Sequence, residues 1–271
     1  MDAAEMEIHT AIQKLLKWGI CQQDEDTRWI ACNRHTAAIE QHGPECGLVA
    51  LSMAINMLEP HTSVRADKSH ILEAARERGF TKQGEMFSAR NLLTLAIDLY
   101  SVRGKVLEGG MTEQRGPILS HLAQGWPVLV PYDKDGNCEP CCHRGHKAHW
   151  AVLTGFVLQS NRQTMKDIHS SVWQPATRLP NVYLAGSLAD CENVHGAMQE
   201  VLNWVPACGI YVLARQGKSR HGHVWAYPTL CSSNADLLEL GPRILDDPGG
   251  FVVPEGGIQA GLCNQVVLLR P

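Results

Sequence analysis

A cysteine at the predicted start of a helix is the residue in this sequence best placed to do chemistry. Cys46 follows the turn residues Gly43 and Pro44, and an apolar run typical of a buried helix begins with it. Unpaired backbone N–H groups and the positive end of a helix favour thiolate, the form of cysteine that attacks a carbonyl carbon. Gly47 would leave room for a substrate backbone. Gln41 could direct its amide N–H to the same point and, with the Cys46 backbone N–H, form an oxyanion hole.

A nucleophilic cysteine needs a base, and among 13 histidines His149 is the best placed. It opens an apolar, strand-like segment, in which Trp150 and the following residues would pack and fix the imidazole. A cysteine at a helix start and a histidine on a distant strand form the papain-type arrangement, with a thiolate–imidazolium pair across a cleft. Taken alone, Cys46 is also explained as a small buried residue and His149 as a core or capping histidine. Together they favour catalysis.

The elements that must position these residues change character along the chain. The first part is predicted to be helical, over residues 3–18, 46–58, 67–78 and 88–99. Residues 20–40 show no clear period and are predicted to be loop. After residue 100, short β-branched segments predict strands at 101–108, 126–132, 149–159, 209–216, 223–227 and 264–270.

This order predicts an α+β fold, with a helical N-terminal half packed on an antiparallel, β-rich C-terminal half. We expect one domain over residues 1–271, with an N-terminal helix in 1–19, a mainly helical half in 40–125 and a mainly β half in 126–271. Residues 160–190 have no confident period and are predicted to be an insertion or a mobile loop.

Composition limits the class of protein. The 271 residues carry a formal net charge of −4 with mixed signs, which gives no footprint for nucleic acid. The apolar run at 151–158 is far too short to span a membrane, and the N-terminus shows no apolar signal core. Ten cysteines without a secretory context predict a cytoplasmic protein with reduced thiols. Six are interpreted as packing residues: Cys21, Cys32, Cys191, Cys208, Cys231 and Cys263.

A dense group of metal-binding residue types precedes His149. It consists of Cys138, Cys141, Cys142, His143 and His146. Three or four of them could hold Zn²⁺ and brace the loop that leads to His149. Strong zinc motifs bring a second pair from a distant segment, which is missing here, so we favour a loop without metal and predict no cofactor. His221 and His223 would share one face of a strand, with no evident carboxylate partner.

Longer strings of the sequence resemble known peptidases. The pattern Q-x4-C-G-L-V-A-L-S-M at 41–53, followed by H-W-A-V at 149–152, is similar to papain-like peptidases related to bacteriocin-processing enzymes. The strings at 130–152, 215–227 and 252–265 resemble more specifically the actin maturation protease family. These motifs occur in the right order over most of residues 40–271.

The resemblance implies a papain-like aminopeptidase that removes the N-acetylated first residue, Met or Cys, from immature actin. It implies Cys46 as nucleophile, His149 as base and Gln41 as the oxyanion-hole side chain. Actin is the implied partner, with the actin–profilin complex as a further candidate, although this chain has no proline run that would suit profilin. Where the family carries an acidic residue, this chain has Ala226. Asn234 or Asp236 could orient the imidazole instead, and spacing does not choose between them.

The implied substrate suggests what should surround the site. An acetylated N-terminus has no ammonium group, so it calls for an apolar pocket, and the acidic residues that follow call for cations. Candidate cations are Arg144, Lys147, Arg215, Lys218 and Arg220, each of which is also explained as a solvated loop charge. Two other functions remain open: an isopeptidase or deubiquitinase on the same fold, and a non-catalytic actin-binding module on a degenerate peptidase fold.

Overall fold

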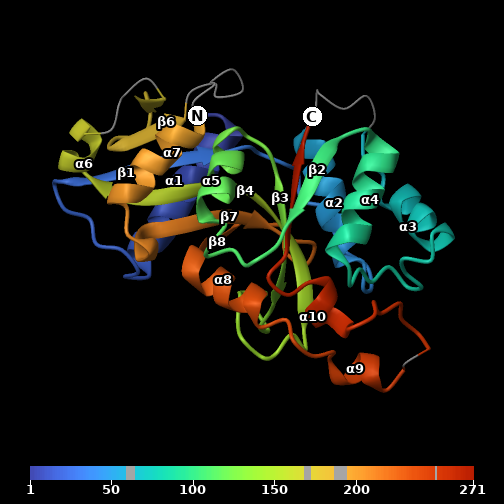
Figure 1. Cartoon of the computed structure of the whole chain (residues 1–271). Coiled ribbons are helices and arrows are strands. Elements are labelled where there is room, and N and C mark those ends of the chain that lie inside the picture. The colour runs from blue at the N-terminus through green and yellow to red at the C-terminus, as the bar shows by residue number, and fades with distance from the viewer. Residues whose placement is uncertain (59–64, 168–171, 186–193, 248) are drawn as a thin grey trace.

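The computed structural model describes residues 1–58, 65–167, 172–185, 194–247 and 249–271, which are organised around a branched sheet (Figure 1). The strands follow the order β2-β9-β3-β4-β1-β6-β5, while β7 pairs with β4 and β8 pairs with β7. Their bounds are β1 Thr27–Asn33, β2 Arg103–Leu107, β3 Val128–Asp133, β4 Ala148–Asn161, β5 Trp173–Pro175, β6 Val182–Ala185, β7 Ile210–Arg215, β8 His223–Ala226 and β9 Val266–Arg270. Among these pairs β1–β6 is parallel and the others are antiparallel.

Strand β4 connects the parts of this sheet. It pairs with β3 through residues 148–153, with β1 through 155–161 and with β7 through 152–158. The register with β7 shifts between Leu153 and Gly155. A Cβ on Gly155 would overlap the Cys32 carbonyl oxygen, so only glycine fits this close approach of β1. The first residues of β4, which include His149, therefore have a fixed position between β3 and the end of β7.

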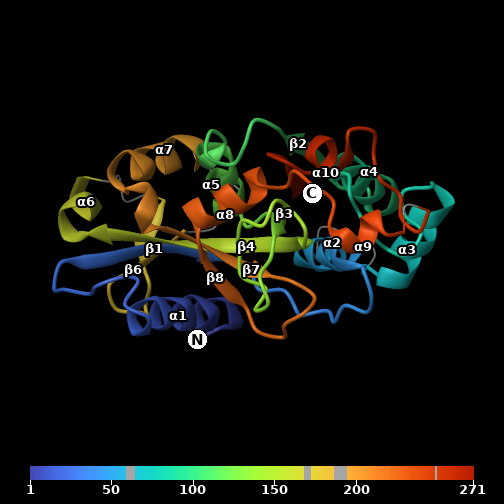
Figure 2. The same cartoon turned by 90° about the horizontal axis from the view of Figure 1, so that it is seen from below.

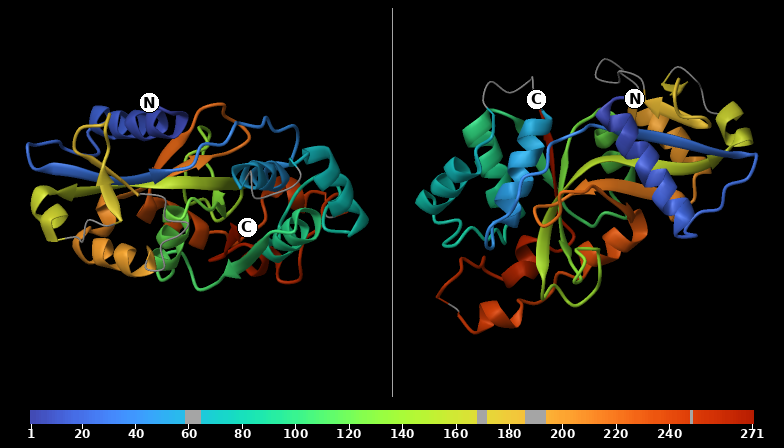
Figure 3. Two further views of the ribbon diagram at one scale, coloured as in Figure 1. Left: turned by 90° about the horizontal axis from the view of Figure 1, so that it is seen from above. Right: turned by 180° about the vertical axis from the view of Figure 1, so that it is seen from behind.

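Helices cover both faces of the sheet. They are α1 Ala3–Lys17, α2 Cys46–Met57, α3 Lys68–Glu77, α4 Ala89–Tyr100, α5 Arg115–Ala123, α6 Arg162–Asp167, α7 Val194–Trp204, α8 Tyr227–Ala235, α9 Pro242–Leu245 and α10 Gly257–Gly261. Seen from below, α5, α7 and α8 lie on one face and α1 on the other (Figure 2). Helices α2, α3 and α4 gather at one end of the molecule, as the views from above and behind also show (Figure 3). No helix in the described part of the chain is long and apolar enough to cross a membrane.

Capping and burial explain the main helices. Helices α1, α3 and α4 begin after Asp2, Asp67 and Ser88, whose side chains each accept a hydrogen bond from a first-turn backbone N–H. Helix α2 is apolar on all sides, as expected for a helix surrounded by protein, and packs against Trp150 and Val152 of β4. The start of α2 is thus pressed against the start of β4.

The four predicted helices and six predicted strands are confirmed, with ends that differ by a few residues. Helices α2 and α4 pack on the sheet, and α3 packs on these two helices, which agrees with the α+β expectation. Trp18 lies at the C-cap of α1, with 56% of its surface exposed.

Three expectations need correction. Residues 20–40 are not all loop, because they contain β1, whose near-complete burial removes the polar–apolar alternation that would reveal a strand. The segment 160–190 contains α6, β5 and β6; its residues 168–171 and 186–190 lie outside the described part of the chain. The C-terminal half is also less purely β than expected, because it contributes α7, α8, α9 and α10.

Candidate active site

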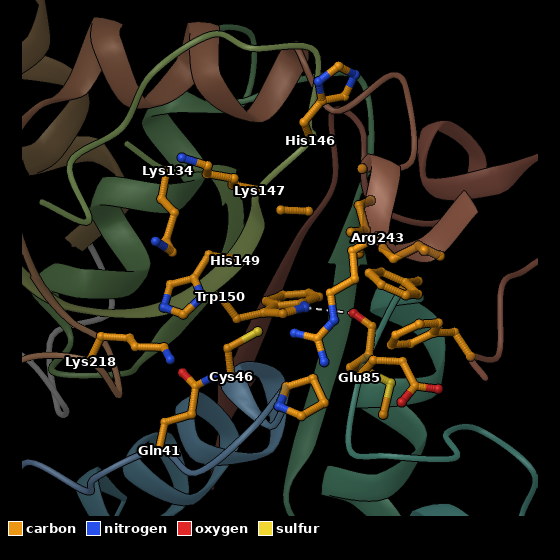
Figure 4. A pocket seen from close by; sticks show the side chains of 18 of the residues that line it. Gln41, Cys46, Glu85, Lys134, His146, Lys147, His149, Trp150, Lys218 and Arg243 are labelled. Atoms are coloured by element: carbon orange, nitrogen blue, oxygen red, sulfur yellow. Dashed lines mark hydrogen bonds between the residues drawn. The ribbon is translucent and has the colours of Figure 1, made fainter. Parts of the chain in front are cut away.

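The three residues predicted to form the site line one cavity of about 420 Å³. Gln41 comes from the segment before α2, Cys46 is the first residue of α2, and His149 is the second residue of β4. Figure 4 shows their side chains directed into the same space from these separate elements. The fold therefore brings together the thiol, the imidazole and the amide that the sequence pattern singled out.

The start of α2 leaves its backbone N–H groups available to the cavity. Glu45 occupies the N-cap position but makes no capping hydrogen bond, and its carboxylate instead pairs with Lys68 at 2.8 Å. The Cys46 sulfur interacts with the backbone N–H groups of Gly47 and Trp150. The Gly47 N–H belongs to the helix start and that of Trp150 to β4, and both would stabilise negative charge on the sulfur.

Burial nevertheless favours the thiol form of Cys46. Only 9% of the residue is exposed, and loss of solvation raises the pKa of the thiol to about 11. The backbone N–H groups and the positive charge of Lys218 lower this pKa but do not overcome burial. The resting thiolate–imidazolium pair stays a prediction, whereas the raised pKa favours a neutral thiol that would lose its proton as it attacks.

Gly47 has a different role from the one expected. A Cβ at this position would lie 2.7 Å from the Met86 Cβ and 3.2 Å from the Trp150 ring. The Trp150 indole N–H donates to the Met86 carbonyl at 2.8 Å, the dashed line in Figure 4. Gly47 thus allows the protein's own side chains to pack against the helix start, and it leaves no extra room for a substrate backbone.

Gln41 is anchored beside the thiol. Its backbone N–H donates to the Gly217 carbonyl at 2.8 Å, and its side-chain Nε2 donates to the Gly43 carbonyl at 2.6 Å. The amide nitrogen carries a second N–H and lies on the Cys46 side of the group in Figure 4. The buried Oε1 has no hydrogen-bond partner among the described residues, an unfavourable arrangement of the kind found where a side chain is held for a ligand.

His149 is held as a neutral, buried imidazole. It is 3% exposed, and the Tyr132 ring meets it edge-on with 5.8 Å between ring centroids. Burial lowers the pKa of His149 to about 3, although the hydrogen bond that His149 donates to Gln216 acts in the opposite direction. The Nε2 atom lies 3.3 Å from Gln216 Oε1, so Nδ1 is the ring nitrogen left for the thiol.

Gln216 stands where the sequence suggested Asn234 or Asp236. The Asn234 side chain donates to two backbone carbonyls, those of Pro131 and Gln265. Asp236 accepts the backbone N–H of Arg144 at 2.6 Å. Neither contacts His149 in the described structure, so Gln216 replaces both as the candidate that orients the imidazole.

Strand pairing explains why Gln216 was missed. Ala226, where the resemblance implied an acidic residue, pairs with Tyr211, whereas Gln216 directly follows the other end of β7. Because Arg215 pairs with Val152 of β4, Gln216 comes to the level of Ala151, two residues from His149 along β4, and its side chain reaches the imidazole. A polar residue directly after an apolar strand was the one available signal in the sequence.

The metal-type residues do not converge as one group. Of the five, Cys141 and His143 come together, with Sγ and Nδ1 3.1 Å apart, and Asp133 offers a third ligand atom within 4.8 Å. The Asp133 carboxylate is already engaged, because it accepts the backbone N–H groups of His143, Gly145 and Lys147. Among the described residues, His146 instead lies 3.3 Å from Glu239. The Asp133 carboxylate therefore organises the loop by hydrogen bonding.

The other described cysteines agree with the expected reduced state, but only some of them agree with their interpretation as packing residues. All nine cysteines that the structure describes are free, and Cys191 lies outside the described residues. Cys21, Cys32 and Cys231 are buried, as expected for packing residues. Cys208 is exposed, so its interpretation as a packing residue was wrong.

Both cations and apolar side chains line the cavity. Of the predicted cations, Lys147 and Lys218 line it, whereas Arg144, Arg215 and Arg220 pair with Glu239, Glu7 and Glu40. Lys134 and Arg243 were not predicted but also line the cavity. The apolar lining includes Met86, Phe87, Trp150, Ile244, Phe251 and Leu262. Figure 4 shows the Arg243 side chain reaching toward Cys46.

The neutral state of the thiol predicts how Cys46 reacts with iodoacetamide. Because its pKa is raised to about 11, the thiolate fraction at pH 7 is small and grows about tenfold per pH unit up to the pKa. We expect the alkylation rate of Cys46, followed by mass spectrometry in the absence of substrate, to rise steeply between pH 7 and 10. A rate that is already constant from pH 6 upward would show a resting thiolate instead.

Comparisons with known proteins identify the relatives of this chain. The family model described as "Actin maturation protease-like, C-terminal domain" matches residues 36–157, which contain Gln41, Cys46 and His149. The chain is 37% identical over 262 residues to the actin maturation protease of Xenopus tropicalis, covering 96% of this chain and 80% of the relative. It is 38% identical over 247 residues to that of Danio rerio, covering 91% of this chain and 76% of the relative. For the Homo sapiens protein, the identity is 36% over 265 residues, covering 96% and 71%.

The fold, the cavity and these relatives define a peptidase. The similarity extends over nearly all of this chain and over more than two thirds of each of the three relatives. The chain belongs to the actin maturation protease family.

Proposed function

We propose that this chain is a cysteine aminopeptidase of the cytoplasm that removes the N-acetylated first residue, Met or Cys, from immature actin. The observation that carries the proposal is the cavity shared by Cys46, His149 and Gln41 in a member of this family. A thiol, a neutral imidazole and an amide donor are the groups that thiol-dependent acyl transfer requires.

The geometry suggests the following steps. His149 Nδ1 takes the Cys46 proton as the sulfur attacks the carbonyl carbon of the first substrate residue. The Gln41 amide and the Cys46 backbone N–H donate to the oxyanion. The imidazolium then protonates the leaving amine, which frees actin with a new N-terminus and leaves an acyl thioester on Cys46. Water, deprotonated by His149, hydrolyses the thioester and releases the acetylated amino acid.

The lining of the cavity fits the substrate. The acetyl group and the Met side chain are apolar and uncharged, which suits the wall that contains Met86, Trp150 and Phe251. The residues after the scissile bond are acidic, which suits cations in the lining such as Lys147 and Arg243.

The test incubates the purified chain with intact actin and with actin-derived peptides that begin with acetyl-Met-Asp or acetyl-Met-Glu. We expect mass spectrometry to show loss of one acetylated residue, while the same peptides with a free amino group are cleaved more slowly. Intact actin and intact acetylated peptides after prolonged incubation would refute the proposal. Cleavage of a ubiquitin isopeptide bond in place of these substrates would support the isopeptidase alternative.

Arg243 is expected to determine the preference for acidic substrates. It is exposed, lines the cavity and has no ion-pair partner among the described residues. Loss of one charge-assisted contact costs about 1.5 kcal/mol, so Arg243→Ala should lower kcat/KM on Asp- or Glu-containing peptides about tenfold. For peptides with Asn or Gln at that position, the same substitution should change kcat/KM by less than about twofold. Arg220→Ala, which removes an exposed cation paired with Glu40, serves as the matched control.

A further inference from the structure

A continuous row of hydrogen-bonding side chains runs from His149 to the surface. His149 Nε2 lies 3.3 Å from Gln216 Oε1, and Gln216 Nε2 lies 3.2 Å from His223 Nε2. His223 Nδ1 in turn lies 3.0 Å from Glu139 Oε1. Gln216 is 1% exposed, whereas 47% of the Glu139 side chain is exposed, so the row connects the deepest part of the site with the loop before β4.

The donors and acceptors of this row fit in one arrangement. Gln216 Oε1 also accepts the backbone N–H of Lys218 at 2.6 Å, which places the amide oxygen toward His149. The amide NH₂ group then faces His223 Nε2, which must be a lone pair to accept it. The His223 proton is therefore on Nδ1, where the Glu139 carboxylate accepts it.

The consequence for His149 follows directly. An oxygen opposite Nε2 requires a proton on Nε2, so the lone pair of the neutral imidazole lies on Nδ1. If the amide were reversed, its NH₂ group would require the lone pair on Nε2, and Nδ1 could not accept the thiol proton. The amide orientation thus decides whether His149 is a competent base.

Aromatic packing keeps both imidazoles in the row. The Trp225 ring lies 5.4 Å from His223 and 4.9 Å from Tyr132, measured between ring centroids. Tyr132 also meets His149 edge-on and donates its hydroxyl hydrogen to the Cys138 carbonyl at 3.0 Å. Since the rings are fixed in place, the row can differ only in the tautomers of the two histidines and in the orientation of the Gln216 amide.

We propose that His223 and Glu139 are positioning residues, which hold the Gln216 amide in the orientation that leaves His149 Nδ1 free to accept the Cys46 proton. The inference rests on the proposed function and extends it to residues outside the cavity. Lys218 contributes part of the orientation through its backbone, so the effect of Glu139 is that of a single hydrogen bond.

The kinetic test compares Glu139→Ala in three backgrounds. In the otherwise unchanged chain we expect kcat to fall about fivefold with KM nearly constant. In a His223→Phe background, which keeps a ring against Trp225, Glu139→Ala should cause no further loss because the row is already interrupted. In a Gln216→Glu background it should also have no effect, since a carboxylate presents an oxygen in either orientation. Equal losses in all three backgrounds would show a merely structural role and overturn the inference.

Two controls complete this test. Asn137→Ala changes an exposed residue of the same loop whose side chain makes no interaction in the described structure, and it should leave kcat unchanged. Thermal unfolding should be unchanged in Glu139→Ala because the side chain is half exposed.

A spectroscopic measurement separates failure of this inference from failure of the proposed function. ¹⁵N chemical shifts of the histidine rings report the tautomer without any turnover. We expect Nε2–H for His149 and Nδ1–H for His223 in the unchanged chain, and a mixture of His149 tautomers in Glu139→Ala. Nδ1–H on His149, or an unaltered tautomer in the variant, would overturn the inference even in an active peptidase.

Discussion

Alanine at Cys46 or at His149 is expected to reduce kcat on acetylated actin peptides by at least about 1000-fold, since each removes a group that takes part in bond formation. The two groups act in one step, so the double variant should be hardly slower than either single variant. Binding of the peptide should persist in Cys46→Ala, because the cavity walls remain. Single-turnover mass spectrometry measures the rate, and fluorescence titration with a labelled peptide measures binding.

The structure provides a matched control for this prediction. Cys141 and His143 form a second thiol–imidazole pair, 3.1 Å apart, in the loop before β4. The pair is more exposed and does not line the cavity. Alanine at Cys141 or at His143 should therefore leave kcat within about twofold of the unchanged chain. Loss of activity in these variants together with full activity in Cys46→Ala would identify Cys141, in the loop, as the nucleophile instead.

Local chemistry indicated the candidate site residues that the structure brings onto one cavity. Cys46 stands out because a Gly-Pro turn and an apolar helix surround it, and both features are readable from neighbouring residues. His149 stands out because it opens a long apolar strand. The structure places both, with Gln41, on one cavity. Short-range patterns thus sufficed for the residues whose backbone setting is itself distinctive.

Long-range pairing and burial account for what was missed. Gln216 reaches His149 only because β7 pairs with β4, and no local pattern reveals which strands are neighbours. Arg243 reaches the cavity from α9, a four-residue helix late in the chain. The helix start, which favours the Cys46 thiolate, is visible in the sequence, whereas the burial that raises the pKa of this thiol is not.

Asp133 shows how a buried carboxylate can hold the loop that leads to the site. It is fully buried at the end of β3, and its carboxylate accepts the backbone N–H groups of His143, Gly145 and Lys147 at 2.7, 3.0 and 3.1 Å. These bonds fold residues 143–147 back onto β3 immediately before β4 begins. Lys147 lines the cavity, so the same carboxylate that stabilises the loop also positions part of the site.

Asp133→Ala is therefore expected to destabilise the fold strongly. It leaves buried backbone donors without their charged acceptor, at a combined cost of about 3–5 kcal/mol, which corresponds to a decrease in Tm of roughly 10 °C. Asp133→Asn should also destabilise, because its NH₂ group would face at least one of the N–H donors. Thermal and urea unfolding measure both effects.

Asp135→Ala is the matched control for Asp133. Asp135 also accepts two backbone N–H groups, those of Asn137 and Glu139, but from a partly exposed position. Water can replace its carboxylate, so Asp135→Ala should lower the free energy of unfolding by about 1 kcal/mol or less. A Tm in Asp133→Asn equal to that of the unchanged chain would show that the buried carboxylate does not hold the loop. Since the loop continues directly into β4, the peptide-cleavage rate at a temperature where Asp133→Asn is still folded should fall as well.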